Sequence, residues 1–160
     1  MLKYSSNESK NGSHFFINTN AESIHLLSFA KVDEEVMSFD NAFLQENVVE
    51  MQIARVSGQR ENFCSALGVT IKSIFDKLLY RYDDLIVYLS VPSGSLKEML
   101  IDRYINADTN DEFFGYFVTV DGYTLYFFFN EHKTSSVKCL NSIAEFFKSE
   151  YDIDLKMILE

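Results

Sequence analysis

Apolar and polar residues alternate along three stretches in the first third of the chain, residues 14–18, 23–32 and 48–56. A period of two is typical of strands that bury one face. In the third stretch valine, methionine and isoleucine occupy one face, and glutamate and glutamine occupy the other. The polar residues 1–13 before these stretches predict a frayed end or a weak edge strand.

The period then changes to that of a helix. Apolar residues recur at steps of three and four, which predicts the buried face of a helix over residues 63–80. A continuous apolar strand, residues 85–91, follows directly. If it shares a sheet with strand 48–56, the two should be parallel and joined by a right-handed crossover. A V-shaped splay between them would mark a cofactor slot, whereas tight pairing would remove it.

Strand 85–91 ends at Pro92, because proline cannot donate a hydrogen bond to a sheet ladder. Ser95 and Glu98 have the spacing of a capping box, in which the serine hydroxyl accepts from the Glu98 N–H and the Glu98 carboxylate accepts from the Ser95 N–H. A second helix is therefore expected over residues 96–106.

An aromatic hairpin comes next. Asp121 and Gly122 form the pair that a two-residue type I′ turn requires, and strands 113–120 and 123–129 flank them. Both faces of this hairpin carry aromatic side chains, so a helix or a partner chain should cover the second face. A last amphipathic helix is predicted over residues 136–151.

These elements predict a single α+β domain over residues 1–160. Its sheet should be mixed and mostly antiparallel, with about six or seven strands and three main helices. The chain of 160 residues is 47% hydrophobic and 15% aromatic, which supplies enough apolar material for one core.

Charge narrows the classes of partner. The formal net charge is −10 and the sequence contains no run of Lys or Arg, so the surface should repel the phosphate backbone of a nucleic acid. No stretch approaches the length of about 20 apolar residues that a membrane-spanning helix needs, and no apolar leader is recognisable. We therefore expect a cytoplasmic protein that binds neither nucleic acid nor membrane.

No catalytic or metal site stands out among the residues that most often form one. His14, His25 and His132 lie far apart and have no helical ligand spacing. Cys64 and Cys139 are also far apart, and we expect them to be reduced thiols. We assign no catalytic residue and no metal ligand.

Two short loops have the features of an anion site, because each ends a strand and opens a helix whose first N–H groups lack partners. If the two strands are parallel neighbours, both loops lie at the same edge of the sheet. The alternative is that Ser95 only caps its own helix and Gly58 only turns the chain. The candidate ligand-binding residues are Arg55, Ser57, Gly58, Gln59, Arg60, Ser93, Gly94 and Ser95.

The order of predicted elements resembles the core of the Gcn5-related N-acetyltransferase (GNAT) superfamily. In that superfamily a Gln/Arg-x-x-Gly-x-Gly/Ala turn holds the pyrophosphate of acetyl-coenzyme A. Residues 55–60 meet the first four places, but Arg60 stands where glycine or alanine allows close approach of the backbone. The resemblance implies an acyl-CoA N-acyltransferase-like topology, acetyl-coenzyme A as cofactor, and Tyr104 as the candidate general acid.

A second resemblance covers nearly the whole chain. Residues 16–19, 85–88 and 103–105, together with Gly94 and the aromatic hairpin, resemble an uncharacterised bacterial domain of unknown function. That resemblance implies a fold and no known activity.

Three hypotheses of function follow. The first is a non-enzymatic binding or interaction module, an acetyltransferase-like scaffold with a degenerate cofactor loop and an aromatic hairpin that contacts a protein partner or a second copy. The second is an N-acetyltransferase that uses acetyl-coenzyme A with an atypical pyrophosphate loop. The third is a protein that binds a small anionic metabolite at the paired loops.

Overall fold

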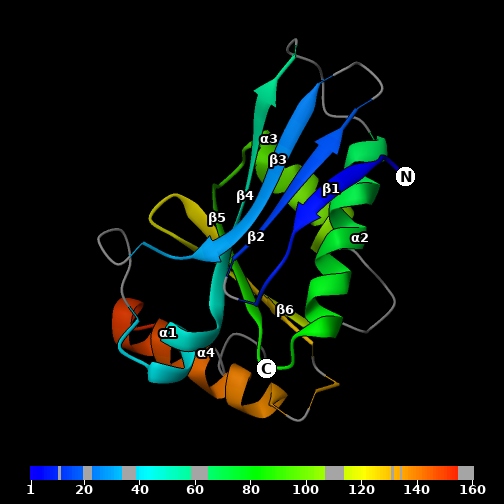
Figure 1. The fold of residues 1–160 in the computed structure, drawn as a ribbon. Helices are drawn as coiled ribbons and strands as arrows, with labels where there is room; N and C mark the ends of the chain where they lie inside the picture. Colours follow the sequence, from blue (N-terminus) through cyan, green and yellow to red (C-terminus); the bar gives the residue numbers. More distant parts are fainter. Residues whose placement is uncertain are drawn as a thin grey trace.

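The computed structural model describes residues 1–10, 12–19, 23–33, 39–58, 65–106, 114–130, 132–133 and 135–154, with the backbone alone at residues 106 and 114–117. Within these ranges, seven strands form one sheet in the order β1-β2-β3-β4-β5-β7-β6 (Figure 1). The strands are β1 (Tyr4–Asn7), β2 (Gly12–Asn18), β3 (Ile24–Lys31), β4 (Val48–Ser57), β5 (Ile86–Pro92), β6 (Phe114–Val120) and β7 (Tyr123–Phe129). The helices are α1 (Ala42–Asn47), α2 (Ser65–Arg81), α3 (Leu96–Ile101), the π-helical segment η1 (Asp102–Asn106) and α4 (Ser136–Tyr151).

The predicted α+β fold with a mixed, mostly antiparallel sheet is confirmed. β4 and β5 pair in parallel, and every other pair of neighbouring strands in the described sheet is antiparallel. The order of strands and helices on which the acetyltransferase resemblance rests is confirmed as well. The polar N-terminal segment forms β1, a four-residue strand at the edge of the sheet.

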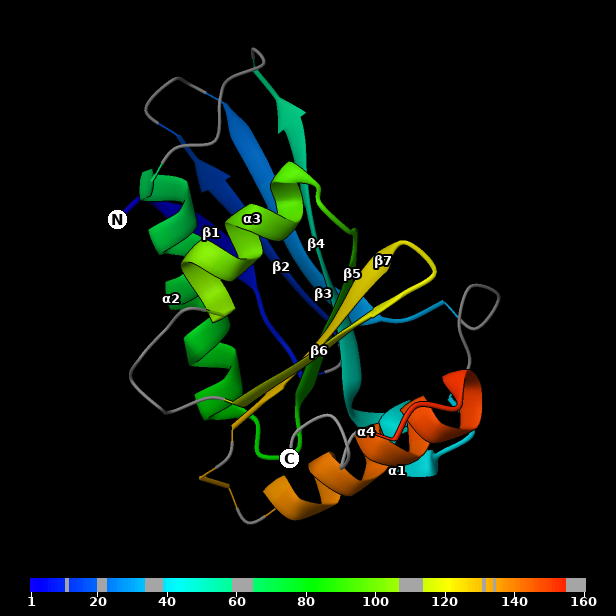
Figure 2. The same cartoon turned by 180° about the vertical axis from the view of Figure 1, so that it is seen from behind.

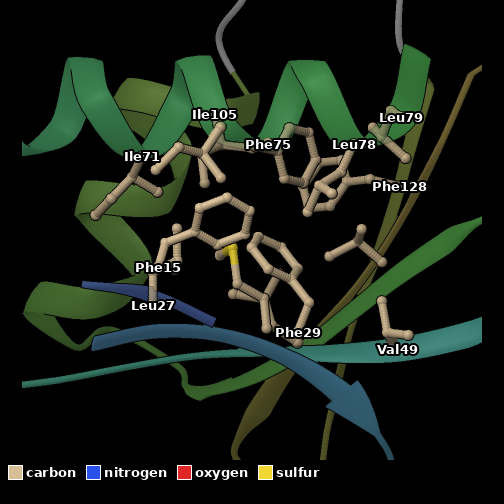
Figure 3. Packing of buried hydrophobic residues seen from close by; sticks show 14 of the residues in the cluster. Phe15, Leu27, Phe29, Val49, Ile71, Phe75, Leu78, Leu79, Ile105 and Phe128 are labelled. Carbon is tan, nitrogen blue, oxygen red and sulfur yellow. The ribbon is translucent and has the colours of Figure 1, made fainter. Parts of the chain in front are cut away.

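Each face of the sheet has its own hydrophobic cluster. α2 and α3 lie over one face, as Figure 2 shows, and we call this the α2 face. Below α2, Phe75 contacts Phe128 edge-on at 5.2 Å between ring centroids, and Phe15 contacts Phe29 at 6.0 Å (Figure 3). The second cluster joins α1 and α4 to β5 and β7 on what we call the α4 face. The central strands are therefore buried on both sides, which explains the unbroken apolar run of β5.

The aromatic hairpin has the predicted register and turn. Val120 pairs with Tyr123. Asp121 and Gly122 have φ values of 51° and 82°, as a type I′ turn requires. Helices cover both faces of β7, the strand of the hairpin whose side chains the structure describes. On β7, Tyr126 and Phe128 are buried on the α2 face, whereas Phe127 and Phe129 are buried on the α4 face.

Two details differ from the sequence expectation. The β3–β4 ladder has a register shift between Ile24 and His25, whereas the apolar pattern of β3 pointed to a bulge further along, between Leu26 and Phe29. The second helix changes from α to π geometry at Asp102. Cys139 is a free, buried cysteine, and burial raises the pKa of its thiol to about 11. None of the described helices has the length and hydropathy needed to cross a membrane.

Replacing Phe127 with alanine should lower the free energy of unfolding by about 3–5 kcal/mol. The Phe127 ring is fully buried and contacts Tyr88, Phe146 and Phe147, so its removal leaves a cavity. Urea denaturation measures the change. Tyr123, which is 50% exposed on the same strand, is the control, and Tyr123→Ala should cost under about 1 kcal/mol. Equal losses for the two variants would contradict this account of the core.

Candidate functional site

The parallel ladder between β4 and β5 is short. Its three pairs are Val48 with Ile86, Val49 with Val87, and Glu50 with Tyr88. Beyond them β4 continues to Ser57 along β3, while β5 continues to Pro92 along β7. The two strands therefore splay in a V that opens toward their carboxyl ends, and the geometry that would mark a cofactor slot is present.

A cavity of about 560 Å³ lies in this V, and we call it the β4–β5 slot. Its walls come from β3, β4, α2, β5, α3 and η1. Successive residues of β4 from Glu50 to Arg55 all line it. The helices that line it, α2, α3 and η1, all lie on the α2 face, so the slot lies on that side of the sheet along the edge of β4.

Charges are distributed unequally along the slot. Glu50 lies at its closed end, as the last paired residue of β4. Arg55 lies five residues further along β4, about 17 Å away at the rise of a strand. His25 pairs with Arg55 across the β3–β4 ladder, and Lys97 of α3 lines the same cavity. The closed end is thus acidic and the open end basic.

A β-bulge lies next to this basic end. His25 pairs with Arg55 and Ile24 with Ser57, so Val56 is the extra residue of β4. A bulge bends its strand and changes the direction of adjacent side chains, and bulges are frequent beside functional sites. The irregularity therefore marks the same end of β4 as the charged residues.

Tyr104 of η1 forms part of the slot wall where η1 packs against α2. An ideal Cβ built on Gly68 would lie 2.8 Å from Cγ and Cδ1 of the Tyr104 ring. Glycine in the middle of a helix costs about 1 kcal/mol relative to alanine, and here it provides room for the ring. The Tyr104 hydroxyl lies 3.4 Å from Oγ of Ser65. Short π-helical segments are frequent at functional sites, and η1 brings Tyr104 to this one.

Two carboxylates hold α3 and η1 on the hairpin. Thr124, which is buried, donates its hydroxyl hydrogen to the Glu98 carboxylate. One helical turn later, Tyr126 donates to Asp102 at 2.9 Å. Burial raises the pKa of Tyr126, and the hydrogen bond to Asp102 raises it further. These contacts fix the helical wall of the slot against β7.

The first predicted anion loop follows β4. Arg55 lines the slot. Ser57 and Gly58 are exposed at the end of the strand, and Gly58 has a φ of 88°, a value that favours glycine. Gln59 and Arg60 lie outside the described residues, so their part of the predicted site stays a prediction.

The second predicted loop follows β5, and its polar groups take part in the fold. Ser93 Oγ lies 3.0 Å from Oγ1 of Thr124, and Ser95 Oγ accepts from the Glu98 N–H at 3.2 Å. The Glu98 carboxylate returns to the Gly94 N–H at 3.4 Å rather than to Ser95 as the capping box predicted. A carboxylate therefore lies where an anion would bind, and the reading of Ser95 as a helix cap is confirmed.

Sequence reasoning missed Glu50, His25 and Ser90 as cavity residues. Each lies on a strand among residues with ordinary strand spacing, so no motif marks it. Their common feature is position around the splay, which is a tertiary property. Glu50 and His25 supply groups that can accept a proton, and Tyr104 supplies one that can donate.

Among the described residues, no group of three or more His, Cys, Asp or Glu side chains could hold a metal ion.

Comparisons with known proteins give one distant likeness. No model of a known protein family matches the sequence, and no curated protein is significantly similar to it. Membership of the uncharacterised bacterial family therefore stays a prediction. Spermidine/spermine N-acetyltransferase SpeG from Vibrio cholerae, solved with manganese ions, is 13% identical over 84% of this chain and 71% of its own, with a TM-score of 0.44. A chimera of this SpeG and hSSAT is 12% identical over 84% and 73%, with a TM-score of 0.44. Likeness at this level transfers neither activity nor ligand.

The contact between Gly68 and Tyr104 can be tested by a double-mutant cycle. Alanine at an ordinary interior helix position should stabilise the protein by about 1 kcal/mol relative to glycine. We expect Gly68→Ala to give no such gain in the wild type, because the new methyl group displaces the Tyr104 ring. In a Tyr104→Ala background the same change should recover about 1 kcal/mol.

Urea denaturation of the four proteins gives the coupling energy. A gain of about 1 kcal/mol from Gly68→Ala in the wild type would show that η1 does not pack as described.

Proposed function

We propose that the protein is a ligand-binding module on an acetyltransferase-like scaffold, and that the β4–β5 slot binds an extended ligand of the acyl-coenzyme A type. The observation that carries the proposal is the end of the parallel ladder at Glu50 and Tyr88, followed by a cavity of about 560 Å³. Ligand pockets commonly have volumes of about 300–1,000 Å³. In open α/β sheets, ligands bind at the carboxyl ends of parallel strands.

The backbone of the two strands favours an extended ligand over a compact one. Among the described residues, β4 beyond Glu50 pairs with β3 alone, and β5 beyond Tyr88 pairs with β7 alone. Each strand therefore turns one row of backbone N–H and C=O groups toward the slot. A chain with amide groups, such as the pantetheine arm of coenzyme A, can satisfy these groups as an added strand would.

The slot lining also suits an acyl thioester. Leu67, Leu89, Val91 and Ile105 give it apolar walls, and Gln52 and Ser90 add a few polar groups. This combination is typical of small-molecule and cofactor sites. A protein partner or homodimer through the aromatic hairpin stays a prediction. It gains little support from β7, because helices cover both faces of that strand.

Calorimetric titration with acetyl-coenzyme A tests the proposal, and we expect binding in the micromolar range. Ala54 is exposed and lines the slot, so Ala54→Phe should fill the slot and weaken binding by about tenfold or more. The free energy of unfolding should stay within about 0.5 kcal/mol. Gly58→Glu would not separate a loss of binding from a loss of stability, because the positive φ of Gly58 strains any residue with a side chain.

Ser6→Phe, at an exposed position of β1 away from the slot, is the matched control and should bind acetyl-coenzyme A as the wild type does. No heat at millimolar acetyl-coenzyme A would refute the proposal. Equal binding by the Ala54 and Ser6 variants would place the ligand elsewhere.

N-acetyl transfer is a second candidate, favoured by the position of Tyr104 in the slot wall. An amine nitrogen would attack the thioester carbonyl, the carbon–sulfur bond would break, and the leaving thiolate would take the phenol proton of Tyr104. The proton that the amine nitrogen loses would then return to the Tyr104 phenolate, which restores the acid. Loss of a general acid commonly costs about 10²–10⁴ in rate. We therefore expect Tyr104→Phe to lower kcat for release of the coenzyme A thiol by about 100-fold while the calorimetric Kd of acetyl-coenzyme A is unchanged.

Thiol release measured with a panel of primary amines makes this test. If acetyl-coenzyme A binds but none of the amines causes release of the coenzyme A thiol, the transferase is excluded and the proposal of a binding module stands.

A further inference from the structure

Part of the α4 face of the sheet is open. On that face α1 and α4 pack against β5 and β7, and Figure 1 shows that no described helix covers the upper parts of β1 to β4. Phe15, Ile17 and Leu27 of β2 and β3 point into the cluster of the α2 face. Because neighbouring side chains on a strand point to opposite faces, the residues between them lie on the open part of the α4 face.

Apolar residues occupy neighbouring positions on this open part. Phe16 of β2 is 42% exposed and pairs with Leu26 of β3, which pairs in turn with Ala54 of β4. Ile24 lies on the same side of β3 and is partly exposed, as Leu26 is. An antiparallel sheet commonly leaves one face to water, but that face then carries polar residues. We call the following six residues the outer patch: Phe16, Asn18, Ile24, Leu26, Ser28 and Ala54.

Charge sets the outer patch apart from the rest of the protein. None of its six residues is charged, although the chain of 160 residues carries 24 acidic and 14 basic ones. A low content of charged residues distinguishes the centre of a protein interface from the remaining surface. With a formal net charge of −10, two copies of the chain repel each other at a distance. At the outer patch they can meet without bringing like charges into contact.

We propose that the outer patch is the contact surface of a homodimer, in which the same patch of a second copy packs on it face to face. An apolar row with polar residues beside it is complementary to itself, as a two-fold contact requires. A partner of another sequence would be recognised on so acidic a protein by complementary charge, and the patch offers none. The proposal is independent of the ligand of the slot, although Ala54 places the border of the interface beside the slot.

The size of the patch determines how strong the dimer is. At the spacings of a sheet, an area four strands wide and about six residues long measures roughly 20 Å by 20 Å. Two such surfaces bury about 800 Å² in total, and interfaces under about 1,200 Å² are weak or transient. We therefore expect a reversible dimer with a dissociation constant on the order of 100 µM.

Sedimentation equilibrium at concentrations from about 5 to 500 µM tests the proposal, since a dimer of this strength forms by mass action within that range. The weight-average mass should rise with concentration from 18.5 kDa, the mass of one copy, toward twice that value. Added salt should strengthen the dimer, because it screens the repulsion between two acidic copies and the patch has no ion pair to lose.

Two substitutions of Phe16 test the patch itself. Phe16→Asp should weaken the dimer by about tenfold or more, because it places a carboxylate in the middle of the contact. Phe16→Thr removes the ring, adds no charge and keeps a residue that strands favour, so it should weaken the dimer by about threefold. Its free energy of unfolding should stay within about 1 kcal/mol of the wild type, which urea denaturation measures.

The matched control is Val69→Asp on α2, which makes the same change in charge on the opposite side of the sheet. Val69 is 53% exposed, and valine and aspartate have similar helix propensities. This variant should dimerise as the wild type does.

Three results would overturn the proposal. The first is the mass of a single copy at every concentration, with and without added salt. The second is a dimer that neither Phe16→Asp nor Phe16→Thr weakens, which would place the interface elsewhere. The third is a dimer that Val69→Asp weakens as much as Phe16→Asp does, which would show an effect of net charge rather than of the patch. If Phe16→Asp does not fold, the comparison of Phe16→Thr with the wild type decides.

Discussion

The junction between β4 and β5 is the constraint on which the rest of the molecule depends. It has three paired positions, yet it joins four strands on one side to three on the other. Packing on both faces compensates for the short ladder. Val49 and Val87 pack in the cluster under α2, while Val48 and Ile86 pack in the cluster under α4. The two clusters hold the strands together at one end, so the strands are free to diverge at the other.

In the described part of the chain, the splay leaves two strand edges in the middle of the sheet without a partner strand, and such edges can pair with another chain. α3 and η1 cover this opening on the α2 face (Figure 2). α3 has no buried residue, whereas Ile105 of η1 is buried in the cluster of the α2 face. The hydrogen bonds from Thr124 and Tyr126 of β7 to Glu98 and Asp102 also hold the two segments in place. The hairpin thus determines where the wall of the slot lies.

Local patterns predicted the parts of the fold that local interactions determine. The Asp121-Gly122 turn fixed the hairpin register, because paired positions in a two-residue loop sum to a constant. The period of α2 followed from one buried face. The bulge at Val56 and the change to π geometry at Asp102 could not be predicted in this way. Both arise where an element adjusts to its neighbours in space.

The candidate site shows the same division. Arg55 was found because it precedes a loop between a strand and a helix, whereas Glu50 and His25 lie inside strands and line the slot, at its two ends, only because of the splay. A strand residue that lines the slot has the same sequence spacing as a strand residue that a helix covers. At the turn around Gly94, by contrast, the sequence predicts a site that the structure does not support. Its sequence has the features of an anion site, but the first turn of its helix supplies its own carboxylate, Glu98. An acidic residue three places after a helix cap therefore argues against anion binding at that cap, because its carboxylate can occupy the position that the anion would take.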